Sequence, residues 1–92
     1  AGSYEEALSL VNDTRFGLTA GIMTRSLARA SHFRRNARVG CVMVNLPTAG
    51  TDYHVPFGGR GDSSYGPREQ GRSAVEFYTH VKTGYIAAGA PL

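Results

Sequence analysis

Residues 56–71 read Pro-Phe-Gly-Gly-Arg-Gly-Asp-Ser-Ser-Tyr-Gly-Pro-Arg-Glu-Gln-Gly, with five glycines and two prolines among sixteen residues. Glycine is used where a chain needs a positive φ or passes close to another backbone or a ligand, so this density indicates a shaped loop. Phe57 and Tyr65 support an ordered loop, because flexible linkers carry few aromatic side chains. From Pro67 onward the pattern favours a helix with proline in its first turn. The sequence therefore predicts an ordered loop leading into a helix over residues 67–78.

Upstream of this loop the pattern predicts two helices and two strands. Ser3 and Glu6 have the spacing of a capping box, and an apolar stripe follows, so residues 3–12 are predicted to be helical. Residues 18–24 form a short uncharged run typical of a strand, and Gly21 within it indicates close approach by a neighbouring element. The apolar run Cys41–Val44 is typical of a strand covered on both faces.

The second helix is predicted over residues 27–37, with Ser26 as its N-cap and four apolar side chains facing inward: Leu27, Ala30, Phe33 and Ala37. A strand, a helix and a strand in this order form a βαβ unit, whose two strands run parallel. The fold class is therefore α/β.

Two segments indicate that the unit is incomplete by itself. Residues 46–66 form a long connection for which we expect no secondary structure, which is unusual inside a small complete domain. Residues 79–87 alternate as a strand does, with Val81, Thr83 and Tyr85 on one face, but this sequence shows no partner for them. We therefore expect a partner chain.

The composition is that of one globular unit of 92 residues, with 41% hydrophobic and 18% charged residues. No apolar run reaches the roughly 18 to 20 residues of a membrane helix, so we expect neither a membrane nor a targeting segment. The single cysteine, Cys41, excludes an internal disulfide and lacks companions for a zinc site, which favours the cytoplasm.

The net charge of +3 is accompanied by a cluster of arginines, Arg29, Arg34, Arg35 and Arg38. Such a cluster is compatible with a nucleic-acid surface or a small basic oligomeric interaction module. We favour a solvated helix face and expect no nucleic-acid partner, because no aromatic platform accompanies the arginines.

Candidate chemical residues are few. Cys41 lies in an apolar run without a nearby histidine, so a buried structural thiol is favoured over a nucleophile. Asp52 and His54 could form an acid–base pair or half of a metal site, but no third ligand is evident. Arg60-Gly61-Asp62 spells an adhesion tripeptide that we interpret as chance. The glycine spacing matches neither the Rossmann pattern nor the P-loop.

Several motifs in their order carry a family resemblance. They are Glu6-Ala7-Leu8, Phe16-Gly17-Leu18-Thr19-Ala20-Gly21, Pro56-Phe57-Gly58-Gly59, Gly66-Pro67-Arg68-Glu69-Gln70-Gly71 and Tyr78-Thr79-His80-Val81-Lys82-Thr83. Together they resemble the C-terminal end of the NAD(P)-dependent aldehyde dehydrogenase superfamily. Residues 45–57 are most similar to the branch that acts on 2,5-dioxovalerate, also called α-ketoglutaric semialdehyde.

The resemblance implies a fragment of an oxidoreductase whose catalytic cysteine and glutamate lie upstream, so no catalytic, cofactor-binding or metal-binding residue is expected here. NAD or NADP would serve the parent protein and would not bind this fragment. The fragment would comprise the end of a catalytic domain (1–66), a helix (67–78) and an oligomerisation strand with its tail (79–92). That strand, residues 79–87, would pair with a neighbouring subunit of a homo-oligomer.

The resemblance also implies an aldehyde-binding wall made by six residues: Thr48, Ala49, Gly50, Thr51, Asp52 and Phe57. Two positions depart from the family pattern. Arg60 follows the Gly-Gly pair where lysine is common, and His80 stands where many relatives carry an acidic residue, which leaves an ion pair to Arg68 unsupported.

Overall fold

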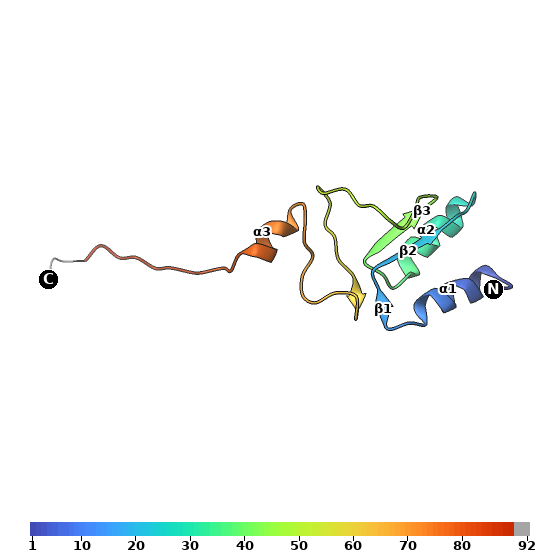
Figure 1. Ribbon diagram of the computed structural model, residues 1–92. Helices are drawn as coiled ribbons and strands as arrows, with labels where there is room; N and C mark the ends of the chain where they lie inside the picture. The colour runs from blue at the N-terminus through green and yellow to red at the C-terminus, as the bar shows by residue number, and fades with distance from the viewer. Residues whose placement is uncertain (90–92) are drawn as a thin grey trace.

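The computed structural model describes residues 1–89 and contains three helices and four short strands (Figure 1). In chain order these are α1 (Tyr4–Asn12), β1 (Phe16–Gly17), β2 (Thr19–Ile22), α2 (Leu27–Asn36), β3 (Cys41–Val44), β4 (Arg60–Gly61) and α3 (Ser73–Tyr78).

The two long helices begin where their capping residues predict. The Glu6 backbone N–H donates to Ser3 Oγ at 3.1 Å, and the Arg29 N–H donates to Ser26 Oγ at 3.2 Å. Each hydroxyl accepts from an N–H that has no partner within its helix, which is worth about 1 kcal/mol per helix. Both predicted N-caps are confirmed.

Strands β2 and β3 are parallel, with Thr19 opposite Cys41 and Ile22 opposite Val44, and α2 connects them. The predicted βαβ unit is therefore confirmed, although β2 is shorter than residues 18–24. Because side chains alternate along a strand, Ala20, Ile22 and Val42 share one face of this sheet. That face packs on the core.

The core is small and lies between the sheet and the two long helices. Phe33, Ala37 and Val39 are buried, and α1 contributes Tyr4, Leu8 and Val11 around them. Leu27 was predicted to face inward, but 82% of it is exposed, so this prediction is wrong. It is the first residue of α2 and borders an open hollow with Ala30 and Val44, which no described element covers.

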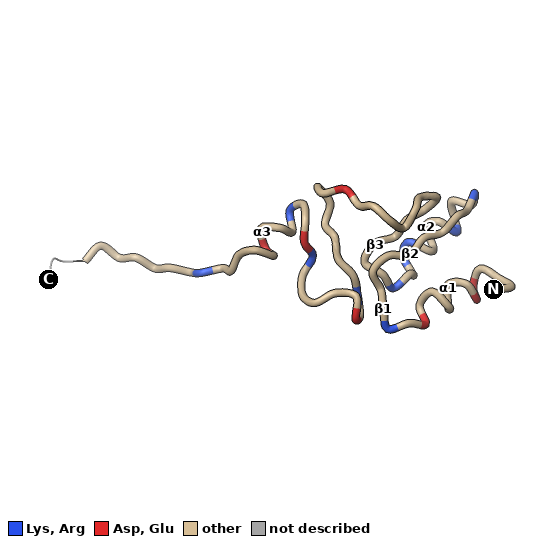
Figure 2. The backbone as a smooth tube through the Cα atoms, viewed as in Figure 1, with Lys and Arg blue, Asp and Glu red and all other residues tan. Residues whose placement is uncertain are grey.

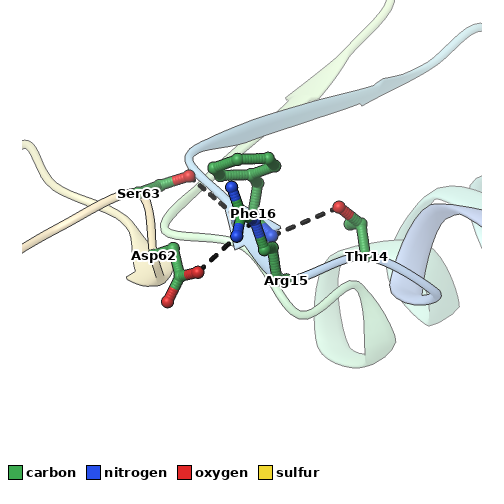
Figure 3. A network of polar contacts seen from close by, with 6 residues as sticks. Thr14, Arg15, Phe16, Asp62 and Ser63 are labelled. Carbon is green, nitrogen blue, oxygen red and sulfur yellow. Dashed lines mark hydrogen bonds and ion pairs between the residues drawn. The ribbon is translucent and has the colours of Figure 1, made fainter.

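The connection over residues 46–66 is not free of secondary structure, which corrects that prediction. Its Arg60–Gly61 segment forms β4, which pairs antiparallel with β1 so that Gly17 lies opposite Arg60. Figure 3 shows polar contacts around this pairing. The Gly17 N–H donates to Ser63 Oγ at 2.9 Å, while Arg15 and Asp62 form an exposed ion pair at 3.5 Å. An exposed pair of this kind contributes little stability, so the backbone pairing and the serine hold the segment.

The backbone crossing of Gly40 and the Gly58–Gly59 pair attaches the loop to the βαβ unit. A Cβ on Gly40 would overlap the Gly58 oxygen and would come within 2.6 Å of its carbonyl carbon and 2.8 Å of Gly59 Cα. Only glycine can occupy position 40 at this separation. On its other side, the Gly40 N–H donates to Gly17 O at 2.9 Å.

The helix predicted over residues 67–78 begins later, at Ser73. Gln70 and Gly71 have φ values of 65° and 52°, which a right-handed helix excludes. Just before them, Phe57 and Glu69 form an antiparallel bridge, so this part of the chain is extended. The glycine-rich loop therefore continues to Gly71.

Residues 79–89 form no strand in this single chain, so the strand predicted over 79–87, which needs a partner chain, stays a prediction. Val81, Tyr85 and Ile86 are at least 95% exposed, and the segment runs away from the rest of the molecule (Figure 1), whose longest dimension is 79 Å. A strand forms only where its backbone hydrogen-bonds to a neighbouring strand. No other described residue makes such backbone bonds with this segment, so it forms no strand here. Residues 90–92 of the predicted unit 79–92 lie outside the described residues. Across the described chain, no helix is both long and apolar enough to cross a membrane.

Candidate functional site

The candidate site lies on the sheet face opposite the two long helices. Thr19 and Gly21 of β2 and Cys41 and Met43 of β3 alternate with the core residues and so belong to this face. The loop that follows β3 returns over it. A Cβ on Gly21 would lie 3.1 Å from the Thr48 methyl group, which confirms that Gly21 is a point of close approach.

Asn45 sets the direction in which this loop leaves β3. Its φ is 57°, a left-handed conformation that asparagine tolerates better than most residues. Its side chain bonds Thr24 twice: Oδ1 accepts from the Thr24 N–H at 2.8 Å, and Nδ2 donates to the Thr24 carbonyl at 2.9 Å. Asn45 thereby ties the start of the loop to the segment that follows β2.

Three of the predicted wall residues lie together. Gly50, Thr51 and Asp52 border an open hollow of about 350 Å³ beneath the loop. The floor of the hollow comes from the sheet and includes Cys41 and Met43. The hollow thus combines an apolar floor with a polar, exposed rim, which is the usual composition of a small-molecule site.

The other three predicted residues do not border this hollow. Thr48 lies beside a hollow of about 480 Å³ that Gly21 and Leu18 also line. Phe57 borders a third hollow of about 300 Å³, together with Tyr65 and Phe77. Ala49 lies exposed in the loop. The described residues therefore do not gather the six into one pocket.

Phe57 is nevertheless the most firmly held of the six. Its backbone N–H donates to Glu69 O at 2.7 Å, and the Glu69 N–H donates back at 2.9 Å. The Arg68 guanidinium donates to Gly59 O at 2.6 Å, and the Gly59 N–H donates to Ser64 Oγ at the same distance. These bonds hold the backbone of the half-buried Phe57 and that of Gly59, two residues farther on.

Cys41 belongs to β3, and its thiol faces the loop. It is half-buried, where sequence reasoning favoured full burial, and its Sγ lies 3.8 Å from Gly58 O. His54 is exposed in the loop and does not border the hollow that Cys41 and Asp52 share. Within residues 1–89, no three His, Cys, Asp or Glu side chains group as metal ligands would. The arrangement can contact and orient a ligand, and it places no base beside the thiol.

Two positioning residues were missed by sequence reasoning. Asn45 had a usable signal, because an asparagine directly after a strand is suited to a left-handed turn. Arg68 had none, since its hydrogen bond to Gly59 depends on a fold that brings residues nine apart back together.

The βαβ unit with a glycine-rich loop across one sheet face has known relatives. Residues 1–84 match the model of the Aldehyde dehydrogenase family. The α-ketoglutaric semialdehyde dehydrogenase of Bacillus subtilis is 42% identical over 84 residues, which are 91% of this chain and 17% of that protein. An α-ketoglutarate semialdehyde dehydrogenase of Haloferax volcanii is 42% identical over 83 residues, covering 89% of this chain and 17% of the relative.

Solved structures of aldehyde dehydrogenases also match the fold of this chain. An indole-3-acetaldehyde dehydrogenase from P. syringae, in complex with NAD+, matches with a TM-score of 0.79 at 37% identity, over 94% of this chain and 17% of that one. A salicylaldehyde dehydrogenase from Pseudomonas putida G7 matches with a TM-score of 0.81 at 26% identity, over 100% of this chain and 19% of that one.

The fold is thus an α/β segment of the kind found in these oxidoreductases. The chain belongs to the aldehyde dehydrogenase family, which confirms the resemblance stated from its motifs. It spans 17% of the length of the two semialdehyde dehydrogenases that it matches.

Two substitutions of Asn45 distinguish the stability that comes from its side-chain hydrogen bonds from the stability that comes from its left-handed backbone. Asn45→Gly removes both bonds to Thr24 and keeps a left-handed φ accessible, so we expect a loss of about 1–2 kcal/mol in the free energy of unfolding. Asn45→Ala loses the same bonds and also strains the backbone, which adds about 1 kcal/mol. Urea unfolding of the two variants measures the difference. An alanine variant at least as stable as the glycine variant contradicts the assigned role of the left-handed turn.

Proposed function

We propose that this chain is the C-terminal part of an NAD(P)-dependent aldehyde dehydrogenase that oxidises an aldehyde to the carboxylic acid, with α-ketoglutaric semialdehyde as its substrate. The observation that carries the proposal is the 42% identity to two enzymes named for that semialdehyde, from a bacterium and an archaeon, over about nine-tenths of the chain.

The chain contributes walls that position the aldehyde. The loop segment Gly50, Thr51 and Asp52 forms a polar rim above the sheet, and Thr48 and Ala49 precede it on the same loop. Phe57 supplies an aromatic ring, and hydrogen bonds fix its own backbone and that of Gly59. A held ring is suited to the wall of a dry pocket, because it excludes water and restricts the orientation of the substrate.

The chemistry itself belongs to the rest of the longer protein. NAD(P)+ would accept the hydride from the aldehyde. We assign it no contact with this chain, because the glycines of the chain lack a dinucleotide-binding spacing. Cys41 is not assigned as the nucleophile, since its Sγ lies against Gly58 O without a neighbouring base. The chain alone is therefore inactive under this proposal.

A second copy of the protein is the partner that we propose for residues 79–87. Val81, Tyr85 and Ile86 are almost fully exposed, and the described chain pairs none of the backbone groups of this segment in a strand. Adding it to the sheet edge of another subunit would satisfy those groups and cover the apolar side chains.

The activity is tested with the longer protein, its Phe57→Ala variant and the 92-residue chain alone. With α-ketoglutaric semialdehyde and either NAD+ or NADP+, the longer protein should show turnover and the chain alone none. Phe57→Ala should lower kcat/KM about tenfold or more, because the aldehyde loses its orienting wall. Initial rates of NAD(P)H formation, followed by absorbance, measure all three.

Phe57→Leu is the matched control, since it keeps an apolar wall and should lose less kcat/KM than Phe57→Ala. Urea unfolding of both variants separates catalysis from stability. Turnover by the chain alone, or an unchanged kcat/KM in Phe57→Ala, contradicts the corresponding part of the proposal.

Removing the terminal segment tests the partner. A stop after Tyr78 removes the chain from residue 79 onward, and we expect it to shift the longer protein toward monomers, because the backbone groups that pair between subunits are lost. Sedimentation equilibrium at micromolar concentration measures the association. The double variant Val81→Thr with Tyr85→Thr, which keeps the backbone and strand propensity, should weaken association less than the truncation. An oligomer unaltered by the truncation assigns the contact to another surface.

A further inference from the structure

Another hollow lies on the helix side of the sheet, away from the loop. It has a volume of about 480 Å³ and opens between α1 and α2. We call it the α1/α2 groove; it is lined by Tyr4, Glu5, Leu8, Ser9, Asn12, His32, Arg35, Asn36 and Arg38. The proposed aldehyde site makes no use of it.

Hydrogen bonds between the two helices hold the groove in shape. The Tyr4 hydroxyl and His32 Nδ1 are 2.7 Å apart. Asn12 spans the far end, where its Nδ2 donates to Asn36 O at 2.9 Å and its Oδ1 accepts from the Arg38 N–H at 2.7 Å. A ligand would therefore meet a preformed site, which lowers the ordering cost of binding.

The charge around the groove is predominantly positive. Figure 2 shows α2 and its flanks carrying basic residues, whereas acidic residues mark α1. Arg35 and Arg38 line the groove against a single carboxylate, Glu5. Within the described residues these two arginines form no ion pair, and the same holds for their exposed neighbours Arg29 and Arg34. The groove thus has guanidinium donors that no carboxylate of residues 1–89 occupies.

We propose that the α1/α2 groove binds a small phosphate-bearing anion, with Arg35 and Arg38 as its charged hydrogen-bond donors. Guanidinium groups pair with phosphate through two parallel, charge-assisted bonds, which lysine cannot reproduce. The volume of the groove falls within the range of small-ligand sites.

Nucleic acid fits the groove less well than a small anion does. Single-stranded nucleic acid is bound by stacking its bases on exposed aromatic rings. The only aromatic ring on α1 is Tyr4, and it is already engaged: His32 meets it edge to face with centroids 5.6 Å apart, and Arg29 Cζ lies 5.8 Å from its centre. The groove therefore provides phosphate donors without a stacking platform.

Inorganic pyrophosphate is the probe for the test, with isothermal titration calorimetry of the longer protein as the measurement. Saturating NAD+ is added to occupy the dinucleotide site, so that pyrophosphate cannot bind there. We expect saturable binding that weakens as KCl is raised. The double variant Arg35→Ala with Arg38→Ala should raise Kd about tenfold or more, because two charge-assisted donors are lost.

The matched control is the double variant Arg25→Ala with Arg72→Ala, which removes the same charge from two exposed arginines outside the groove. It should leave Kd unchanged. Circular dichroism confirms that both double variants are folded, and titration heats do not depend on turnover, so failure of the aldehyde assay leaves this test readable.

Three results overturn the proposal. Absence of saturable pyrophosphate binding removes the site. Equal weakening in the two double variants reduces the effect to overall charge. A single-stranded oligonucleotide of about 12 nucleotides that displaces pyrophosphate, binds more tightly and needs the same arginines assigns the surface to nucleic acid instead.

Discussion

The crossing of Gly40 over Gly58 and Gly59 is the contact on which the rest of the structure depends. It brings two backbones together without side chains between them, at a separation where even a methyl group on Gly40 would overlap a carbonyl oxygen. Two consequences follow directly. The Gly40 N–H reaches Gly17 O on one side, and the Arg60–Gly61 segment reaches β1 on the other. A loop distant in sequence thereby becomes part of the βαβ unit.

The crossing also accounts for the division of the candidate wall residues between hollows. It places the Gly58 carbonyl against Cys41, so the loop contacts the sheet at that point and separates Gly50, Thr51 and Asp52 from Phe57. Farther along, the Phe57–Glu69 bridge and the bond from the Gly71 N–H to Tyr53 O, at 3.2 Å, fasten the loop to itself. This second attachment requires glycine at position 71 for two reasons. Its φ is positive, and a Cβ there would lie 2.6 Å from His54 O.

Local signals in the sequence were sufficient for the βαβ unit and insufficient for its attachments. The N-caps Ser3 and Ser26 and the strand Cys41–Val44 depend on nearest neighbours, and they were predicted correctly. The predicted cover on both faces of that strand is not found among the described residues of this chain, where its four residues are half-buried. The β1–β4 pairing escaped prediction because two residues per strand carry no periodicity. The late start of α3 was missed because Pro67 suits a first helical turn, while the bridge of Phe57 to Glu69 keeps the chain extended.

For the candidate site, glycine density predicted close backbone approach without identifying which backbones meet. Gly21 was correctly interpreted as such a point, because a glycine inside a strand often marks a place where another element comes close. The partner of Gly58 and Gly59 was not predictable, since Gly40 belongs to a distant part of the chain. Leu27 and residues 79–87 show a different limit: their patterns require a covering surface that this chain does not supply among its described residues.

If the close approach of the two backbones at Gly40 attaches the loop, then Gly40→Ala must destabilise the fold. A Cβ at this position meets rigid backbone, so we expect a loss of about 3 kcal/mol in the free energy of unfolding, measured with urea. Gly2→Ala, whose Cβ would meet only Glu6 Oε2 at an ordinary 3.5 Å, should change it by less than about 0.5 kcal/mol. Equal stability of Gly40→Ala and Gly2→Ala would show that the close approach at Gly40 does not attach the loop.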